Sequence, residues 1–249
     1  MRRVLDGRLF TRPAQPATML ETDRVFRLAL RGVNAYLVDD RPGDGDAAGD
    51  DGSWTLVDAG TPLDAGRLRR SLADAGVAPA DVDRVLLTHY DLDHVGTLAT
   101  LGLDAPVHVA EPDASYLDGT ATPPLSNHKG LFQRVTGPFV RRPDLPVERV
   151  TDGEVVGGFR VVRTPGHTPG HTAFVHDGYG VAFVGDVVME DDGDLSPSPW
   201  LLCYDAAENE ASVRTLADRA ADVDAVCVGH GDPIRTGGGD ALDRLVARL

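Results

Sequence analysis

Lysine is almost missing from this chain of 249 residues, since Lys129 is its only one beside 23 arginines. Acidic residues outnumber basic ones by 39 to 24, and aspartate supplies 32 of them. Proteins that hold nucleic acid need a basic surface, whereas only short arginine clusters interrupt this acidic background. We therefore expect no nucleic-acid partner. A net charge of −15 suits concentrated salt, which screens self-repulsion, and it predicts a halophilic cytoplasm.

Cysteine and long apolar runs are scarce as well. Cys203 and Cys227 are the only cysteines, and their spacing fits neither a disulfide framework nor a zinc ribbon. No apolar run approaches the roughly 18 residues that a membrane span requires. The first residues also lack the apolar centre of a signal peptide. We expect a cytoplasmic protein without a membrane partner.

Length and an apolar content of 42% suit one compact domain. No linker of biased composition divides the chain, and chemically distinctive residues run from His89 to His230. We predict a single domain over residues 1–249 with a core from about residue 25 to 249. The stretch from Asp39 to Gly52 holds six aspartates among Gly and Pro, which indicates a solvated hairpin loop and not a metal site.

Four side chains that can bind metal crowd into the motif T-H-Y-D-L-D-H at residues 88–94: His89, Asp91, Asp93 and His94. The motif follows directly after an apolar run, so it predicts a strand that ends in a turn of ligands. Imidazole and carboxylate groups together suit borderline divalent ions such as zinc or ferrous iron. One turn alone does not complete such a site.

Three later fragments supply further candidate ligands. They are P-G-H at His167, G-D at Asp186 and G-H-G at His230. Each follows an apolar, β-branched run, so each candidate ligand lies at the end of a predicted strand. Strand ends that converge on one edge of a sheet form a pocket, and we expect the metal site there.

Hydrophobic periodicity predicts the elements between these motifs. One-sided apolar stripes predict helices near residues 64–75, 94–101, 205–220 and 239–249. Strands are predicted near residues 84–88, 107–110, 159, 172, 181 and 225–228. The Pro-rich segment 112–146 and the segment 189–204 are predicted to be long irregular loops that reach the substrate.

Taken in order, these motifs resemble those of the metallo-β-lactamase superfamily of metallo-hydrolases, namely H-x-H-x-D-H, PGHT, GD and GHG. L-V-D-A-G at residues 56–60 is similar to the first motif of that superfamily, and the match extends from about Val25 onward. The resemblance implies an α+β fold, a four-layer αβ/βα sandwich with metals at the edge between two sheets. The spacing of the later motifs resembles glyoxalase II-like and lactonase-like members more than lactamases.

The resemblance also implies how the ligands divide. Site one would be His89, Asp91 and His167, site two would be Asp93, His94 and His230, and Asp186 would bridge them. The superfamily has His where this chain has Asp91, so the motif here is HxDxDH. Two His and one carboxylate also typify non-haem iron sites. The implied cofactors are two divalent ions, Zn²⁺ first, with Fe²⁺ or Mn²⁺ as alternatives because of Asp91.

Several further residues receive roles in this interpretation. The resemblance places His171 behind the ligands, where it would either hydrogen-bond to them or simply pack. A metal-bound hydroxide would cleave an ester, thioester or lactone of a small metabolite, and Asp93 would orient it and shuttle its proton. Phe132, Trp200 and Tyr204 are candidates for substrate contact, with structural packing as the alternative.

Two other functions stay open. One is an iron-dependent enzyme resembling the persulfide dioxygenases, whose iron would be held by His89, His167 and Asp186. The other is a metal-stabilised binding protein with weak catalysis. Met189 stands near the place where lactone-cleaving relatives carry Tyr, which argues against a homoserine-lactone substrate.

Overall fold

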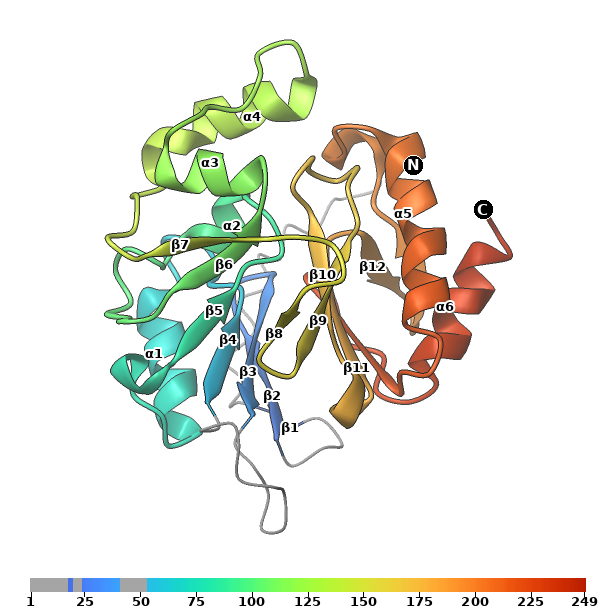
Figure 1. Ribbon diagram of the computed structural model, residues 1–249, viewed down its shortest axis with the longest axis horizontal. Helices are drawn as coiled ribbons and strands as arrows, with labels where there is room; N and C mark the ends of the chain where they lie inside the picture. Colours follow the sequence, from blue (N-terminus) through green and yellow to red (C-terminus); the bar gives the residue numbers. More distant parts are fainter. Residues whose placement is uncertain (1–17, 20–23, 41–52) are drawn as a thin grey trace, which may run out of the picture.

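The computed structural model describes residues 18–19, 24–40 and 53–249. Two sheets lie face to face in it, and helices cover the outer face of each (Figure 1). The predicted four-layer αβ/βα sandwich is therefore confirmed. Most of the Asp-rich hairpin loop predicted at residues 39–52 lies outside the described residues.

The first sheet has seven strands in chain order: β1 (Thr18–Met19), β2 (Val25–Ala29), β3 (Asn34–Asp39), β4 (Trp54–Val57), β5 (Arg84–Leu86), β6 (Val107–Ala110) and β7 (Val147–Val150). Strands β1 to β4 pair antiparallel, whereas β4 to β7 pair parallel. The parallel part needs crossover connections, of which the one from β4 to β5 carries α1 (Ala65–Asp74) and η1 (Pro79–Asp81). It also brings the ends of β4 and β5 to the same edge of the sheet.

The second sheet has the order β14-β11-β10-β9-β8. Its strands are β8 (Val155–Val156), β9 (Phe159–Arg163), β10 (Thr172–His176), β11 (Val181–Gly185) and β14 (Ala225–Val228), with η3 (Asp177–Tyr179) between β10 and β11. Helices α5 (Ala206–Arg219) and α6 (Gly238–Val246) pack on its outer face (Figure 1). Among the described residues, no helix combines the length and apolar character that crossing a bilayer requires.

The buried apolar side chains follow from the alternation of strand residues. In β11, Val181 and Phe183 face the other sheet, while Ala182 and Val184 face α5 and α6. Helix α1 closes the opposite outer face with the buried Leu68 and Leu72 in its apolar stripe. This packing holds both sheets at a fixed distance, so the loops at their shared edge have a rigid support.

The helix predicted over residues 94–101 is wrong in its bounds. The structure has only the short α2 (Leu92–Val95). The N–H of Gly96 donates to the carbonyl of Gly60 instead of continuing the helix. A Cβ at Gly96 would overlap the backbone of Thr61 and Pro62, so the chain packs too closely against that loop to stay helical.

The two segments predicted as irregular loops contain regular structure. Residues 112–146 form α3 (Asp113–Asp118), α4 (His128–Thr136) and η2 (Gly137–Phe139), and residues 188–202 form β12 (Val188–Asp191), β13 (Asp194–Pro197) and η4 (Trp200–Leu202). Asn127 caps α4 by accepting the N–H groups of Lys129 and Gly130. The prolines between these elements concealed the local patterns, because each element is short.

Candidate metal centre

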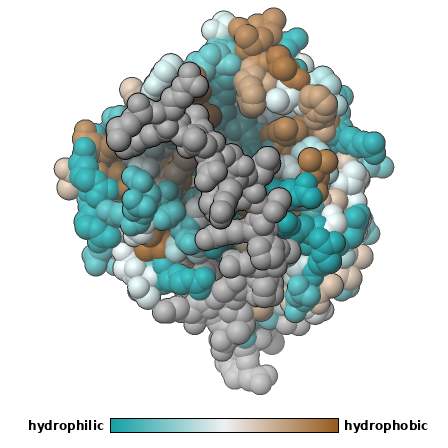
Figure 2. Space-filling view, turned by 180° about the vertical axis from the view of Figure 1, so that it is seen from behind, coloured by the Kyte–Doolittle hydropathy of each residue, from teal (hydrophilic) through white to brown (hydrophobic). Residues whose placement is uncertain are grey.

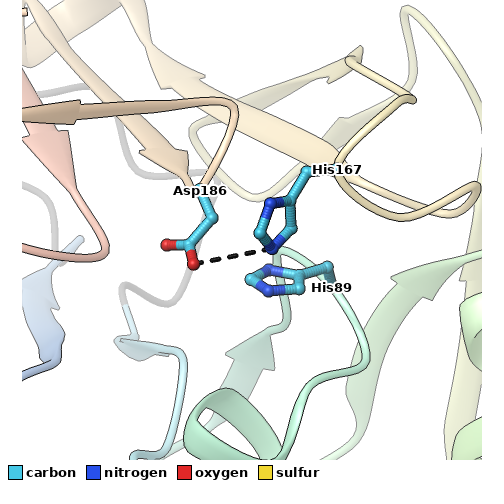
Figure 3. A group of neighbouring side chains, drawn as sticks. All are labelled: His89, His167 and Asp186. Carbon is cyan, nitrogen blue, oxygen red and sulfur yellow. Dashed lines mark ion pairs between the residues drawn. The ribbon is translucent and has the colours of Figure 1, made fainter. Parts of the chain in front are cut away.

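The candidate ligands meet at one edge between the two sheets. His89 follows β5 of the first sheet, whereas His167, Asp186 and His230 follow β9, β11 and β14 of the second. Figure 3 shows His89, His167 and Asp186 approaching one another from separate loops. Residues far apart in the sequence therefore converge where the sequence motifs place them.

We call His89, His167 and Asp186 the first half-site, since their ligand atoms all lie within 4.8 Å of one another. His167 Nε2 lies 3.6 Å from Asp186 Oδ2, the pair joined by a dashed line in Figure 3. Asp91 borders this group, with Oδ2 at 3.3 Å from His89 Nε2 and 3.2 Å from His167 Nε2. The three residues predicted for site one thus lie together.

Asp93, His94 and His230 form the second half-site. His230 Nε2 lies 3.3 Å from Asp93 Oδ2 and 3.1 Å from Asp186 Oδ2. Asp186 therefore reaches both half-sites, as a bridging carboxylate must. The His230 side chain is 28% exposed, whereas the ring of His94 is fully buried, so this half-site opens to solvent on one side.

The site contains buried polar atoms that lack a hydrogen-bond partner among the described residues: His89 Nε2, His94 Nε2, His167 Nδ1 and Asp186 Oδ1. Leaving such an atom unpaired costs about 1–3 kcal/mol. The other ring nitrogens are engaged, since His94 Nδ1 lies 2.9 Å from Asp58 Oδ2 and His89 Nδ1 lies 2.9 Å from Thr88 Oγ1. The free Nε2 atoms are thereby held as ligands, and the donor set fits a first-row divalent ion.

Asp58 is a positioning residue that the sequence analysis did not assign, although its motif was noticed. It follows β4 with a φ of 58°, a left-handed conformation that non-glycine residues rarely adopt. Its buried carboxylate accepts hydrogen bonds from the N–H and the hydroxyl of Thr88 and binds His94. Asp58 thus orients both the ligand turn and one ligand, which explains the unusual backbone.

His171 supports the site from behind. Its Nδ1 lies 2.8 Å from Thr164 Oγ1, and its Nε2 accepts the N–H of Asp186 at 3.1 Å. Burial and then the neighbouring His89 and His167 lower the pKa of His171 well below its usual value, so the ring is a neutral acceptor. The structure places it in the hydrogen-bonding role, not as simple packing.

Negative charge dominates the second half-site. Burial alone lowers the pKa of His230, but Asp186 and Asp93 outweigh it and raise that pKa to about 10. The pKa of His94 is likewise raised well above its usual value, because Asp186, Asp58 and Asp93 outweigh the effect of burial. Without a metal ion, protons on these two rings supply the missing positive charge.

The first half-site has the opposite balance. Burial, and next the charge of Lys129, lower the pKa of His167 to about 4. Burial raises the pKa of Asp91, but Lys129, His167 and His89 outweigh it, so that pKa lies well below its usual value. A neutral His167 and an ionised Asp91 therefore lie next to a lysine ammonium.

Comparison with known proteins agrees with this geometry. A family description for the Metallo-beta-lactamase superfamily matches residues 28–230. The chain belongs to this superfamily. It is therefore related to metal-dependent hydrolases, in which two metal ions share one site. Its relation to glyoxalase II-like or lactonase-like members within the superfamily stays a prediction.

Individual superfamily members are similar over most of the chain. The metallo-beta-lactamase family protein TTHA1429 from Thermus thermophilus has 26% identity and a TM-score of 0.66, over 90% of this chain and 78% of that one. TTHA1623, solved in a di-iron-bound form, has 28% identity and a TM-score of 0.63, over 89% of this chain and 98% of that one. YflN of Bacillus subtilis (strain 168), a probable metallo-hydrolase, is 28% identical over 148 residues, 55% of this chain and 56% of that protein.

Helix α4 adds two residues to the superfamily site that the sequence analysis did not place there. Lys129 Nζ lies 2.9 Å from Asp91 Oδ2, and Gln133 Nε2 donates to Asp91 Oδ1 at 2.7 Å. The two are four residues apart, so they share one face of α4. Tyr204, a candidate for substrate contact or structural packing, donates its hydroxyl hydrogen to Gln133 Oε1. One feature of the sequence could have pointed to this role, namely that Lys129 is the only lysine of the chain.

Phe132 and Trp200, the other candidates for substrate contact, lie on the surface beside the superfamily site. Their exposed fractions are 62% and 69%. The Trp200 ring lies against His128, with 6.0 Å between ring centroids, so η4 contacts the first turn of α4. The structure places both residues at the rim and not among the ligands.

Proposed function

We propose that this protein is a metal-dependent hydrolase that cleaves an ester, thioester or lactone bond in a small metabolite with an apolar acyl group. The observation that supports the hydrolase is the set of buried, unpartnered imidazole nitrogens around Asp186. When bound, a divalent ion, Zn²⁺ or alternatively Fe²⁺ or Mn²⁺, supplies Lewis acidity and an activated water there. The similarity to the probable metallo-hydrolase YflN agrees with this proposal.

Asp93 is the proposed catalytic carboxylate. Its side chain is partly exposed, and only His230 among the described residues lies within ion-pair distance of it, at 3.3 Å. Burial raises the pKa of Asp93, but His94 and His230 outweigh it and lower that pKa, so the carboxylate is ionised at neutral pH. It can accept a hydrogen bond from the attacking water and then its proton.

An apolar rim supports an apolar acyl group. Its exposed members belong to the α4 and η4 regions: Leu125, Leu131, Phe132, Val135, Phe139, Trp200, Leu201 and Leu202. Figure 2 shows hydrophobic side chains gathered at the top of the molecule, where α4 lies in Figure 1. Exposed apolar patches of this kind mark binding surfaces, because they are costly to leave in water.

The rim borders the metal centre directly. Lys129 of α4 donates to the carbonyl of Leu202 at 2.7 Å and reaches His167 from the same helix. A substrate whose carbonyl lies at the metal centre would therefore extend its acyl chain along α4 and η4. This arrangement favours a medium or long acyl chain over an acetyl group.

A series of acyl thioesters and nitrophenyl esters, from two to twelve carbons, tests this proposal on the zinc-loaded protein. We expect kcat/KM to rise with chain length. The double change Phe132→Ser and Trp200→Ser should lower kcat/KM for the long chains by roughly tenfold or more, since burying one such side chain is worth about 1.5–3 kcal/mol. It should leave the acetyl substrates unchanged.

Leu63→Ser is the matched control, because Leu63 is 74% exposed and lies outside the rim. It should behave as the unchanged protein with every chain length. Absence of turnover with all esters, thioesters and lactones, at full metal loading, would contradict the proposal. Tight binding of an acyl metabolite without turnover would then favour the metal-stabilised binding protein.

The dioxygenase alternative requires an iron at His89, His167 and Asp186. These atoms do cluster, and the relative TTHA1623 binds two irons. Lys129 Nζ, however, lies 2.5 Å from His167 Nε2, whose lone pair such an iron would need. The hydrolase is therefore the better-supported function, and consumption of oxygen with glutathione persulfide by the iron-loaded protein would reverse this choice.

A further inference from the structure

Lys129 is a buried lysine whose donors are all used. Its side chain is 5% exposed, and its ammonium has three N–H groups. They meet three acceptors: Asp91 Oδ2 at 2.9 Å, Leu202 O at 2.7 Å and His167 Nε2 at 2.5 Å. Buried charges are stable only when paired and hydrogen-bonded in this way. The Lys129 ammonium is therefore an integral, fully hydrogen-bonded component of the site.

Helix α4 is fixed in a position that keeps Lys129 there. Gln133 binds Asp91 from the next turn, and the Asn127 side chain donates to the carbonyl of Tyr204 at 2.9 Å. Gly130 packs so closely on the carbonyl of Pro124 that a Cβ would overlap it. These contacts lie on both sides of Lys129 and hold its backbone beside the first half-site.

A metal ion at the first half-site would need the atoms that Lys129 already binds. His167 Nε2 has one lone pair, which cannot accept a lysine hydrogen and bind a metal at once. An ion at the usual distance of about 2.1 Å from that nitrogen would lie within about 4.6 Å of the ammonium. Repulsion at this distance would weaken metal binding by at least about 100-fold.

Charge balance favours the same arrangement. Among the candidate ligands, Asp91, Asp93 and Asp186 contribute three negative charges. One lysine ammonium and one divalent ion together balance them. Asp91, which stands where the superfamily has a histidine, provides the carboxylate that pairs with the lysine.

We infer that Lys129 takes the place of the first metal ion, so that the protein holds one tightly bound divalent ion, at Asp93, His94, His230 and Asp186. Lys129 is then a positioning residue that holds Asp91 and His167 in the metal-binding arrangement of the superfamily. The inference rests on the proposed metal-dependent function but needs no turnover. It changes the expected stoichiometry from two ions to one.

Metal content and affinity test this inference. The full-length protein is loaded with zinc, desalted, and analysed by elemental mass spectrometry, and zinc affinity is measured by competition with a chromophoric chelator. We expect one zinc per chain. Lys129→Met, which keeps the length of the side chain without its charge, should bind a second zinc at least about 100-fold more tightly than the unchanged protein does.

Two further variants complete the design. Arg134→Met removes a positive charge from the same helix without touching a ligand, and it should stay at one zinc. Lys129→Met combined with Asp91→Asn removes a ligand carboxylate together with the lysine, so the second zinc should bind more weakly than in Lys129→Met alone. The first comparison separates the loss of the ammonium from a general loss of charge, and the second shows whether the second zinc uses the Asp91 carboxylate.

The outcomes are distinct. Two tightly bound zinc ions in the unchanged protein, or a single zinc in Lys129→Met, would overturn the inference and leave the proposed function intact. One zinc without hydrolysis would refute the function and leave the inference standing, whereas no zinc would refute both. If Lys129→Met does not fold, electron paramagnetic resonance of the manganese-loaded unchanged protein decides, since an isolated ion is expected and a spin-coupled pair would contradict it.

Discussion

The half-site around His167 and the half-site around His230 contain similar ligand types but obtain positive charge differently. Lys129 lies within hydrogen-bond distance of His167, and the pKa of that ring is lowered to about 4. His230 lies within ion-pair distance of Asp93 and Asp186, and its pKa is raised to about 10. The first half-site obtains a positive charge from Lys129, whereas the second, without metal, obtains it from protons on His94 and His230.

This difference shows that a ligand set alone does not determine where an ion binds. Both half-sites contain three residues with ligand atoms within 4.8 Å of one another. What separates them is a residue from α4, outside every ligand motif, that neutralises one side. Removing charge from each half-site in turn tests this difference.

The largest effect is expected from Asp93→Ala. It removes a ligand from the half-site that needs an ion, so zinc affinity should fall by about 1000-fold and hydrolysis should be lost. Asp232→Ala is the control, because Asp232 lies two residues after His230 but pairs with Arg27. Zinc titration and kinetics on both variants make the comparison, and retained activity in Asp93→Ala would refute its catalytic role.

Asp91→Asn changes the first half-site and should lower the stability of the protein. It leaves the buried Lys129 without its carboxylate, which costs about 3 kcal/mol or more in the free energy of unfolding. The single tightly bound zinc should remain. Denaturant unfolding with parallel metal analysis checks this, and loss of the zinc at unchanged stability would show that Asp91 serves mainly as a ligand.

The ligands of both half-sites could be read from the sequence because each sits in a short local motif. His89 to His94 occupy one turn, and His167, Asp186 and His230 each end a strand with a clear β-branched pattern. The four-layer fold followed from the same motifs through resemblance. Local sequence patterns were therefore sufficient to predict the ligands that lie at the ends of strands.

Lys129 and Asp58 could not be placed in this way. Lys129 reaches the centre only because α4 folds back over it, and α4 itself was concealed in a Pro-rich segment. Asp58 acts through a left-handed backbone conformation, which no periodicity reveals. Residues that contact ligands distant from them in the sequence depend on tertiary packing, which a short segment of sequence does not reveal.

A smaller loss is expected when the support of His94 is weakened. Asp58→Asn keeps the volume of the side chain but removes the charge that holds His94 Nδ1. Changes of this kind lower metal affinity by about 10–100-fold. Asp64→Asn is the control, since Asp64 is a buried carboxylate that accepts hydrogen bonds from Thr61 and touches no ligand. Equal zinc affinity in both variants would remove Asp58 from the site.

The smallest effect is expected from a change of pH by one unit, which should alter the affinity for zinc. Because the pKa of His230 is raised to about 10, zinc must displace a proton from it at neutral pH. Zinc affinity should therefore rise about tenfold per pH unit for each proton displaced, and His94 adds a second proton because its pKa is also raised. Calorimetry in buffers of different ionisation enthalpy counts the released protons.

In the metal-free protein, the two half-sites should change the free energy of unfolding with pH in opposite directions. A raised pKa stabilises the fold below the unfolded value of about 6.5, so the contribution of His230 is lost as pH rises toward 10. A lowered pKa does the reverse, so His167 destabilises the fold as pH falls from about 6.5 to 4. Thermal unfolding of the chelated protein should peak near neutral pH, and His230→Gln should flatten only the alkaline side. A flattened acidic side would mean that the two half-sites are not electrically separate.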